Sequence, residues 1–240
     1  KGKKIFIVKQ NRFNKPVILC KQMINEGLLG DLFLGSVRVR WCRKQDYYNS
    51  SKWRGTWNND GGVLSNQAIH HIDLLLYLMG KFDSVNAITR TFGSNIEVED
   101  TAVAQIEFKN NSLGLIEATT ATRPIDLEGS ISLLGSKGAI DIGGFAVNSL
   151  KRLEISDERL KRYYSERVKE FSENPLDIDS FAHKEFYKRV MDSLIEDKID
   201  KAIMASSGID CLELLHSIYV SANENRKVKA SENISYVRLG

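Results

Sequence analysis

Cysteine, proline and long apolar runs are all scarce in this sequence, and each scarcity excludes a class of protein. The three cysteines, Cys20, Cys42 and Cys211, are far apart, odd in number and outside any CxxC pair or Cys/His cluster. They therefore indicate reduced thiols in a cytoplasmic protein rather than a disulfide framework or a structural metal site. Three prolines and the lack of any low-complexity tract argue against long disordered linkers.

Charge and hydrophobicity exclude two kinds of partner. The 34 basic and 31 acidic residues leave a formal net charge of +3, which is too weak and too evenly spread for a nucleic-acid interface. No apolar stretch reaches the roughly 18 residues that span a membrane. With 42% hydrophobic residues in a length of 240, the chain can bury the core of an ordinary globular protein. We therefore expect neither nucleic acid nor membrane as a partner.

The first third of the chain alternates strand and helix patterns. We predict a strand at 4–10, a helix capped by Asn14 that runs to Gly27, a strand at 32–42 and a helix at 63–79. The long loop at 43–61, between the strand at 32–42 and the helix at 63–79, is polar, aromatic and unpatterned. Loops of this length inside a compact domain are often functional.

From residue 84 onward the pattern changes to short strands joined by tight turns. The predicted strands span 84–91, 101–108, 114–121, 128–134, 139–142 and 149–155, followed by helices at 180–195 and 208–225 and a short strand near Val228. Strands joined in this way form mostly antiparallel sheets. We therefore predict an α+β fold: one open, mostly antiparallel β-sheet with helices packed on one face.

The face of this sheet that lacks helices must meet water or another subunit. Leu127, Ile131 and Leu133 lie near one edge of the predicted sheet and are a candidate surface for a homo-oligomer. A solvated face is the alternative.

A polar stripe on an apolar helix is the strongest chemical signal. On a continuous helix Asn66, His70 and Asp73 share one face at spacings i, i+4 and i+7, while Gln67 and His71 line the adjacent face. Such a stripe is costly unless it lines a cavity or finds partners. Histidine suits proton transfer near neutral pH, with Asn66 binding the same hydroxyl group and Asp73 orienting the His70 ring. The alternative is a pair of core histidines with satisfied ring nitrogens.

A metal site is not expected on this helix. Adjacent histidines point about 100° apart and cannot easily share one ion, and an HExxH motif is absent.

The order of motifs around this helix resembles the Gfo/Idh/MocA family of dehydrogenases. The matching residues are Trp53-Arg54-Gly55, Asp60-Gly61-Gly62, Asn66 and His70-x-x-Asp73, with turns at 27–30 and 134–138. The resemblance implies an N-terminal Rossmann domain and a C-terminal open-sheet domain that binds substrate and forms the oligomer. Residues 1–10 would then be the last Rossmann strand, and 11–240 the substrate-binding and oligomerisation domain.

The resemblance also implies roles for individual residues. His70 would act with a lysine to move the proton of the oxidised hydroxyl group, while hydride passes to NAD or NADP. Trp53 and Arg54 would lie towards the cofactor. An Asn66-Gln67 pair is similar to the branch acting on UDP-N-acetyl-glucosaminuronate and related nucleotide sugars. The substrate-binding residues implied by this branch are Arg12, Arg43, Tyr47, Asn66 and Gln67.

The long loop supports a sugar-acid substrate on physical grounds. Arg43 and Arg54 carry charge suited to a carboxylate or phosphates. Tyr47 and Trp53 offer surfaces for a sugar or base. A solvated connection is the alternative for this loop.

One departure from the family is large. The chain has no GxGxxG motif after a strand and no Glu-Lys-Pro motif that would carry the family's lysine. We therefore expect a fragment of an NAD(P)-dependent sugar dehydrogenase, inactive alone. The alternatives are a non-catalytic sugar-binding and oligomerisation module, and a dehydrogenase for a free polyol such as an inositol.

Overall fold

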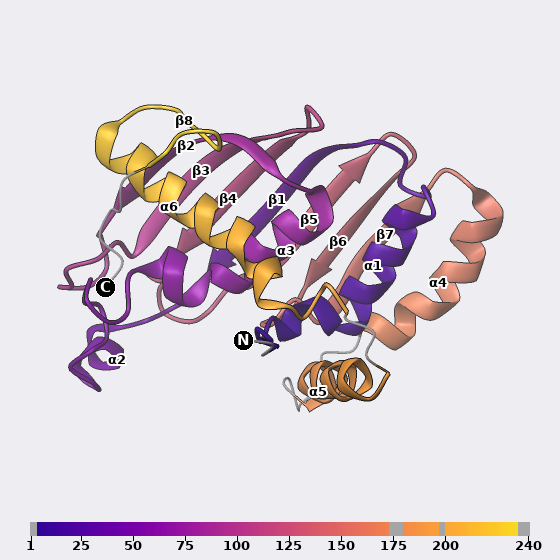
Figure 1. The fold of residues 1–240 in the computed structure, drawn as a ribbon, viewed down its shortest axis with the longest axis horizontal. Helices are drawn as coiled ribbons and strands as arrows, with labels where there is room; N and C mark the ends of the chain where they lie inside the picture. The colour runs from indigo at the N-terminus through magenta and orange to yellow at the C-terminus, as the bar shows by residue number, and fades with distance from the viewer. Residues whose placement is uncertain (1–3, 173–179, 197–199, 235–240) are drawn as a thin grey trace.

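A computed structural model of the chain describes residues 4–172, 180–196 and 200–234, arranged around one eight-stranded sheet (Figure 1). The strand order is β7-β6-β5-β1-β4-β3-β2-β8. The strands are β1 (Leu32–Arg40), β2 (Phe82–Arg90), β3 (Thr101–Phe108), β4 (Leu113–Thr119), β5 (Glu128–Gly135), β6 (Gly138–Gly143), β7 (Ser149–Ile155) and β8 (Val228–Lys229). Neighbouring strands are antiparallel except for β1 and β4, which run parallel. The predicted open, mostly antiparallel α+β sheet is confirmed.

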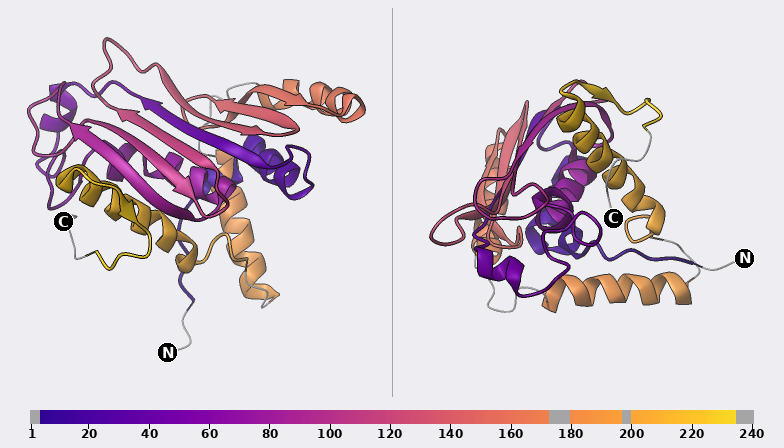
Figure 2. Two further views of the ribbon diagram at one scale, coloured as in Figure 1. Left: turned by 90° about the horizontal axis from the view of Figure 1, so that it is seen from above. Right: turned by 90° about the vertical axis from the view of Figure 1, so that its left-hand side faces the viewer.

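The helical segments gather on one side of the sheet. They are η1 (Gln10–Phe13), α1 (Lys15–Asn25), α2 (Gln45–Asn49), η2 (Val63–Gln67), α3 (Ile69–Met79), α4 (Glu158–Ser172), α5 (Ser180–Ile195), η3 (Ala205–Gly208) and α6 (Ile209–Glu224). Helix α3 packs on β1 and β5, α6 on β2 and α1 on β6. Figure 2 shows these helices on the same face, with α5 set apart from the sheet against η1. None of the described helices combines the length and the apolar character needed to cross a membrane.

The core lies between this helical layer and the sheet. Strands alternate with period two, so in β3 Ala104 and Ile106 are buried while Val103 and Gln105 face outward. The central helix contributes Ile72, whose side chain is fully buried. A continuous apolar core therefore holds α3 against the middle of the sheet.

The predicted self-association residues need a correction. Ile131 and Leu133 are only 1% exposed and point into the helix-covered core, because the phase of β5 places Ser130 and Ser132 on the other face. Leu127 is exposed but lies before β5 begins. The apolar residues that do face outward include Val103 and Leu115.

Two predictions near the amino terminus also differ from the structure. Residues 4–9 lie outside the sheet and contact the chain at 203–205 through an isolated bridge between Phe6 and Met204, and Gln10 already begins η1. Asn14 precedes α1 but makes no side-chain cap. Its amide instead donates to the carbonyl oxygens of Ala146 and Val147 at 2.7 and 3.2 Å.

Two helices were not predicted. Helix α4 is largely charged, but its apolar residues recur at helical spacing at 160, 163, 164, 168 and 171, a signal that the sequence analysis overlooked. It packs against β7 at the edge of the sheet. Helix α2 has five residues and lies inside the segment expected to be a loop. Apart from the helix predicted at 63–79, the other predicted strands and helices form within a few residues of their expected bounds.

Candidate active site

Four of the predicted site residues meet around the ring of Tyr47. The Arg54 guanidinium carbon lies 4.2 Å from the centre of this ring, and the Arg43 guanidinium carbon lies 5.4 Å from it. The Tyr47 hydroxyl oxygen accepts hydrogen bonds from Arg54 Nη1 and, at 3.4 Å, from Gln67 Nε2. Residues from the segment after β1, from α2, from the loop after α2 and from η2 thus form one cationic and aromatic cluster.

Helix α2 holds this cluster in place. The neighbouring Tyr48 is buried, and its hydroxyl group lies 2.8 Å from Thr120 Oγ1 just beyond β4. The two tyrosine rings are perpendicular, with centres 5.1 Å apart. One tyrosine therefore anchors α2 to the sheet while its neighbour faces the site.

Trp53 extends the cluster outward. Its ring is 43% exposed, and the Arg54 guanidinium carbon lies 4.5 Å from the ring centre. The two residues predicted to contact the cofactor therefore lie together at the outer side of the cluster.

Asn66 lies on the same short segment as Gln67, tied to the preceding loop. Its Nδ2 donates to Asp60 Oδ1, while Asp60 Oδ2 accepts the Gly55 amide at 2.7 Å. This segment is a π-helical turn, and Ala68 separates it from α3. The predicted continuous helix from 63 to 79 is therefore wrong, and the i, i+4, i+7 relation of Asn66 to the α3 residues does not hold.

The two histidines occupy different environments. His70 is half-buried in the first turn of α3. His71 is 1% exposed, with its ring centre 5.8 Å from that of Trp41 in an edge-to-face arrangement. Burial, and secondarily His70, lowers the pKa of His71 to about 3. His71 is thus a neutral core residue, whereas His70 remains partly accessible to solvent.

Arg12 lies apart from this cluster, and its guanidinium group is fully engaged. It donates to both carboxylate oxygens of Asp73 at 2.6 and 2.7 Å and to Ser207 and the Ala202 carbonyl oxygen. Lys9 Nζ lies 3.6 Å from the same carboxylate. Because these contacts use all five N–H donors, Arg12 has a structural role in this geometry rather than the predicted contact with substrate. Asp73 is likewise committed to Arg12.

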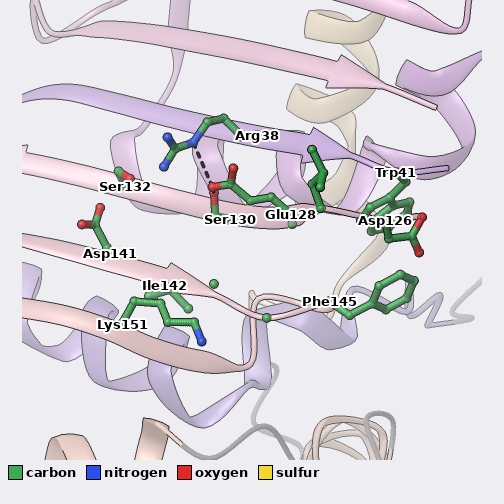
Figure 3. A pocket seen from close by; sticks show the side chains of 14 residues that line it. Arg38, Trp41, Asp126, Glu128, Ser130, Ser132, Asp141, Ile142, Phe145 and Lys151 are labelled. Carbon is green, nitrogen blue, oxygen red and sulfur yellow. Dashed lines mark hydrogen bonds and ion pairs between the residues drawn. The ribbon is translucent and has the colours of Figure 1, made fainter. Parts of the chain in front are cut away.

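A hollow of about 450 Å³ on the uncovered face of the sheet adjoins the cluster through Trp41 (Figure 3). The Trp41 ring stacks on Phe145 with centres 4.7 Å apart, and Arg43 lies 5.2 Å from the Trp41 ring centre. Charged residues of both signs line the hollow: Arg38, Lys151, Asp126, Glu128 and Asp141. With three carboxylates against two cations, it suits hydroxyl groups better than phosphates.

Glu99 was missed by the sequence analysis. It is 4% exposed, and its Oε1 accepts hydrogen bonds from the Leu64 amide and the Tyr219 hydroxyl group. Burial raises its pKa to about 7, more than these hydrogen bonds lower it. The sequence shows only an acidic pair, Glu99-Asp100, before a predicted strand. That pair does not indicate a buried carboxyl group unless the tertiary contacts are known.

Within the described residues, no group of three or more histidine, cysteine, aspartate or glutamate side chains is placed to hold a metal ion.

The chain is similar to several known proteins. A family model described as the GFO/IDH/MocA C-terminal domain matches residues 17–141. The WlbA dehydrogenase from Bordetella pertussis, solved in complex with NADH and UDP-GlcNAcA, is 36% identical with a TM-score of 0.81, over 95% of this chain and 64% of its own. The WlbA dehydrogenase from Chromobacterium violaceum, solved with the same two molecules, is 37% identical with a TM-score of 0.84, over 98% of this chain and 64% of its own.

A further relative is the levoglucosan dehydrogenase of Pseudarthrobacter phenanthrenivorans. It is 27% identical over 155 residues, which are 54% of this chain and 39% of that protein. The chain therefore spans less than two thirds of the length of each of these three relatives.

Proposed function

The chain belongs to the Gfo/Idh/MocA family, whose C-terminal domain its residues 17–141 match. From that premise we propose that the chain is the substrate-binding part of an NAD(P)-dependent dehydrogenase. The proposed reaction oxidises a secondary hydroxyl group of a sugar, and the proposed substrate is a UDP-linked uronic acid. The observation that carries this proposal is the similarity, over almost the whole chain, to WlbA dehydrogenases solved with NADH and UDP-GlcNAcA.

His70 is the proposed proton acceptor. Oxidation of an alcohol removes a hydride from carbon and a proton from oxygen, and bound NAD(P)⁺ supplies the hydride acceptor. The half-buried His70 can take the proton, whereas the neighbouring His71 is sealed in the core. Asn66 and Gln67 offer amide groups that hydrogen-bond a sugar without placing negative charge beside a sugar acid.

The charges of the site favour an anionic substrate near Tyr47. Arg54 lies against its ring and would neutralise a carboxylate or a diphosphate. Arg43 also lies against the ring, but its Nη1 pairs with Asp126 Oδ1 at 3.1 Å, so it would have to leave that partner to do the same. The hollow beside Trp41 carries more carboxylates than cations, so sugar or ribose hydroxyl groups fit it better. A nucleotide sugar would meet both environments.

Trp53 and Arg54 are the proposed cofactor contacts. An exposed indole ring with a guanidinium group on one face fits a contact with a planar ring or a phosphate at one end of a dinucleotide. Two such residues cannot by themselves hold a dinucleotide, so most of its binding would come from another domain.

A second copy of the chain is the proposed partner of the uncovered sheet face. Val103 and Leu115 are 50% and 42% exposed on the central strands β3 and β4. Apolar side chains on a broad flat face favour an isologous contact between identical subunits.

A free sugar or polyol is the second candidate substrate. It is favoured by the similarity to levoglucosan dehydrogenase, although that similarity covers only 54% of this chain. Titration calorimetry of the complete enzyme with UDP-GlcNAcA and with free monosaccharides separates the two candidates. We expect heat of binding with the nucleotide sugar; binding of free sugars alone would contradict the proposed substrate.

The role of His70 is tested by His70→Ala in the complete enzyme. We expect turnover to fall by about 10²–10⁴-fold, because general acid–base groups typically contribute this much. The melting temperature should stay close to that of the wild type, since His70 is only half-buried. The control is His183→Ala, which removes a half-buried histidine on α5. Wild-type turnover in His70→Ala would remove this residue from the mechanism.

A further inference from the structure

A buried carboxyl group lies directly beneath the turn that carries Asn66 and Gln67. Glu99 immediately precedes Asp100 and β3, and it holds the start of η2 at two points. Its carbonyl oxygen accepts the Val63 amide at 2.9 Å, and its Oε1 accepts the Leu64 amide at 3.1 Å. The first two amides of the π-helical turn, which have no partners within the turn, are therefore both satisfied by one residue.

The chain above this carboxyl group is shaped to fit it. A Cβ atom at Gly62 would overlap with the Glu99 carboxyl group, so only glycine lets the backbone pass this close. From the other side, the Tyr219 hydroxyl group of α6 donates to Glu99 Oε1 at 2.9 Å. The Trp57 ring packs edge-to-face on Tyr219, with centres 5.6 Å apart. Glu99 thus joins the turn at 62–67 to α6, and Tyr219 of α6 in turn contacts Trp57 in the loop that precedes this turn.

We propose that Glu99 is a positioning residue of the candidate active site, and that its neutral form holds residues 62–67 in the turn that presents Asn66 and Gln67. The relevance to sugar oxidation rests on the proposed function. The mechanical link between Glu99 and the turn stands independently of it.

The neutral form fits this position for a physical reason. Glu99 Oε2 is buried and has no hydrogen-bond partner among the described residues. The titratable groups that face Glu99 are Tyr219 from α6 and the adjacent Asp100, and neither is a cation. An ionised carboxylate would therefore be buried next to another carboxylate with one oxygen unsatisfied. Burial accordingly raises the pKa of Glu99 from its ordinary 4.5 to about 7.

The pH dependence of the turn follows from this direction. A carboxyl group with a raised pKa stabilises the folded turn at low pH, and this contribution is lost as the pH rises from 4.5 towards 7. Above pH 7 Glu99 is ionised whether the turn is folded or unfolded, so stability falls no further. The site turn should therefore be most ordered in mildly acidic solution.

Hydrogen exchange at the 63–66 amides tests the proposal on the 240-residue chain. After correction for the intrinsic exchange rates, we expect wild-type protection factors to fall by roughly tenfold per pH unit between pH 5 and 7 and then to level off. In Glu99→Gln the amide oxygen keeps both hydrogen bonds but cannot ionise, so protection should be independent of pH. A flat wild-type profile, or the same slope in Glu99→Gln, would overturn the proposal.

Two further variants separate positioning from general stability. Glu213→Gln changes an exposed glutamate on the same helix as Tyr219 and should reproduce the wild-type slope. Tyr219→Phe removes one hydrogen bond to Oε1 but keeps the ring, so exchange at Leu64 should be faster than in the wild type at pH 5.

Activity of the complete enzyme gives an independent measurement. Glu99→Gln should remove a step near pH 7 from the pH profile of kcat/KM, which a merely structural residue would not do. If protection depends on pH as expected but the complete enzyme does not oxidise sugars, the proposed function fails while the positioning role remains. If sugars are oxidised but the exchange slope is absent, only the positioning role fails.

Discussion

At the scale of single residues, adjacency in sequence did not mean similarity in chemistry. Successive side chains on a helix point about 100° apart, so His70 stays half-buried while His71 is enclosed and packs against Trp41. Neither ring nitrogen of His71 has a hydrogen-bond partner among the described residues. The buried ring is therefore neutral, and charging it would cost stability.

The pH dependence of folding tests this assignment. Because burial lowers the pKa of His71 from its ordinary 6.5 to about 3, its contribution to stability is complete above pH 6.5 and is lost as the pH falls towards 3. Between pH 7 and 5 the wild type should lose about 2 kcal/mol more unfolding free energy than His71→Gln, which cannot be protonated. Urea denaturation at both pH values measures the difference.

The comparison has an internal control. His183→Gln removes another histidine, half-buried on α5, and should keep the wild-type change between the two pH values. Equal losses in the wild type and His71→Gln would contradict a buried, neutral His71.

At the scale of elements, the site depends on how α3 is anchored. The helix begins only after Ala68, so the phase of its side chains is independent of the turn before it. Its orientation is instead held by Asp73, whose carboxylate lies 2.6 Å from Arg12 Nη2 and 3.6 Å from Lys9 Nζ. All three side chains are buried, so this ion-pair group joins α3 to η1 and η3.

Breaking this anchor should be strongly destabilising. We expect Asp73→Leu to cost about 3–5 kcal/mol of unfolding free energy, because two buried cations lose their counter-charge. The double variant Arg12→Met with Asp73→Leu should cost less than the sum of the two single variants. Chemical denaturation of the four proteins gives the coupling energy.

An exposed pair provides the matched control for this cycle. Asp192 pairs with Lys188 at 3.1 Å on the surface of α5, so Asp192→Ala should cost less than about 1 kcal/mol. Additive costs at Arg12 and Asp73 would show that the pair does not act as a unit.

At the scale of the whole molecule, the sheet has two unlike faces. Helices α1, α3 and α6 cover one face and enclose the core (Figure 2). The other face carries exposed Val103 and Leu115 among polar residues. This asymmetry is what makes a second copy of the chain the proposed partner of the sheet.

A charge placed on the uncovered face tests this self-association. Leu115→Arg should convert an oligomer into a monomer of 27.1 kDa, because a buried like-charge pair would form across a two-fold axis. Light scattering coupled to size exclusion measures the mass. Leu212→Arg, on an exposed position of α6, should leave the mass unchanged. A wild-type chain that is already monomeric at high concentration would contradict the proposal for this chain.

Much of the fold could be predicted from the sequence because the relevant signals are local. Period-two alternation marked the strands between 101 and 134, and the segments Lys109-Asn110-Asn111 and Gly135-Ser136-Lys137-Gly138 marked two of the turns. The helix at 180–195 was also predicted, because helical patterns are local signals too. Arg43, Tyr47, Arg54 and Gln67 were named as candidate site residues because the order of motifs resembles a known family, but their grouping around Tyr47 was not predicted.

What the sequence alone determined about this protein is therefore its elements, its fold class and the residue types of its site. The tertiary structure decided which partners those residues have. Arg12 is bound to Asp73, His71 is enclosed beside Trp41, and Glu99 supports a turn more than thirty residues earlier in the chain. Burial and the charge of a distant neighbour set the chemistry of each side chain, and both arise only when strands and helices far apart in the sequence pack together.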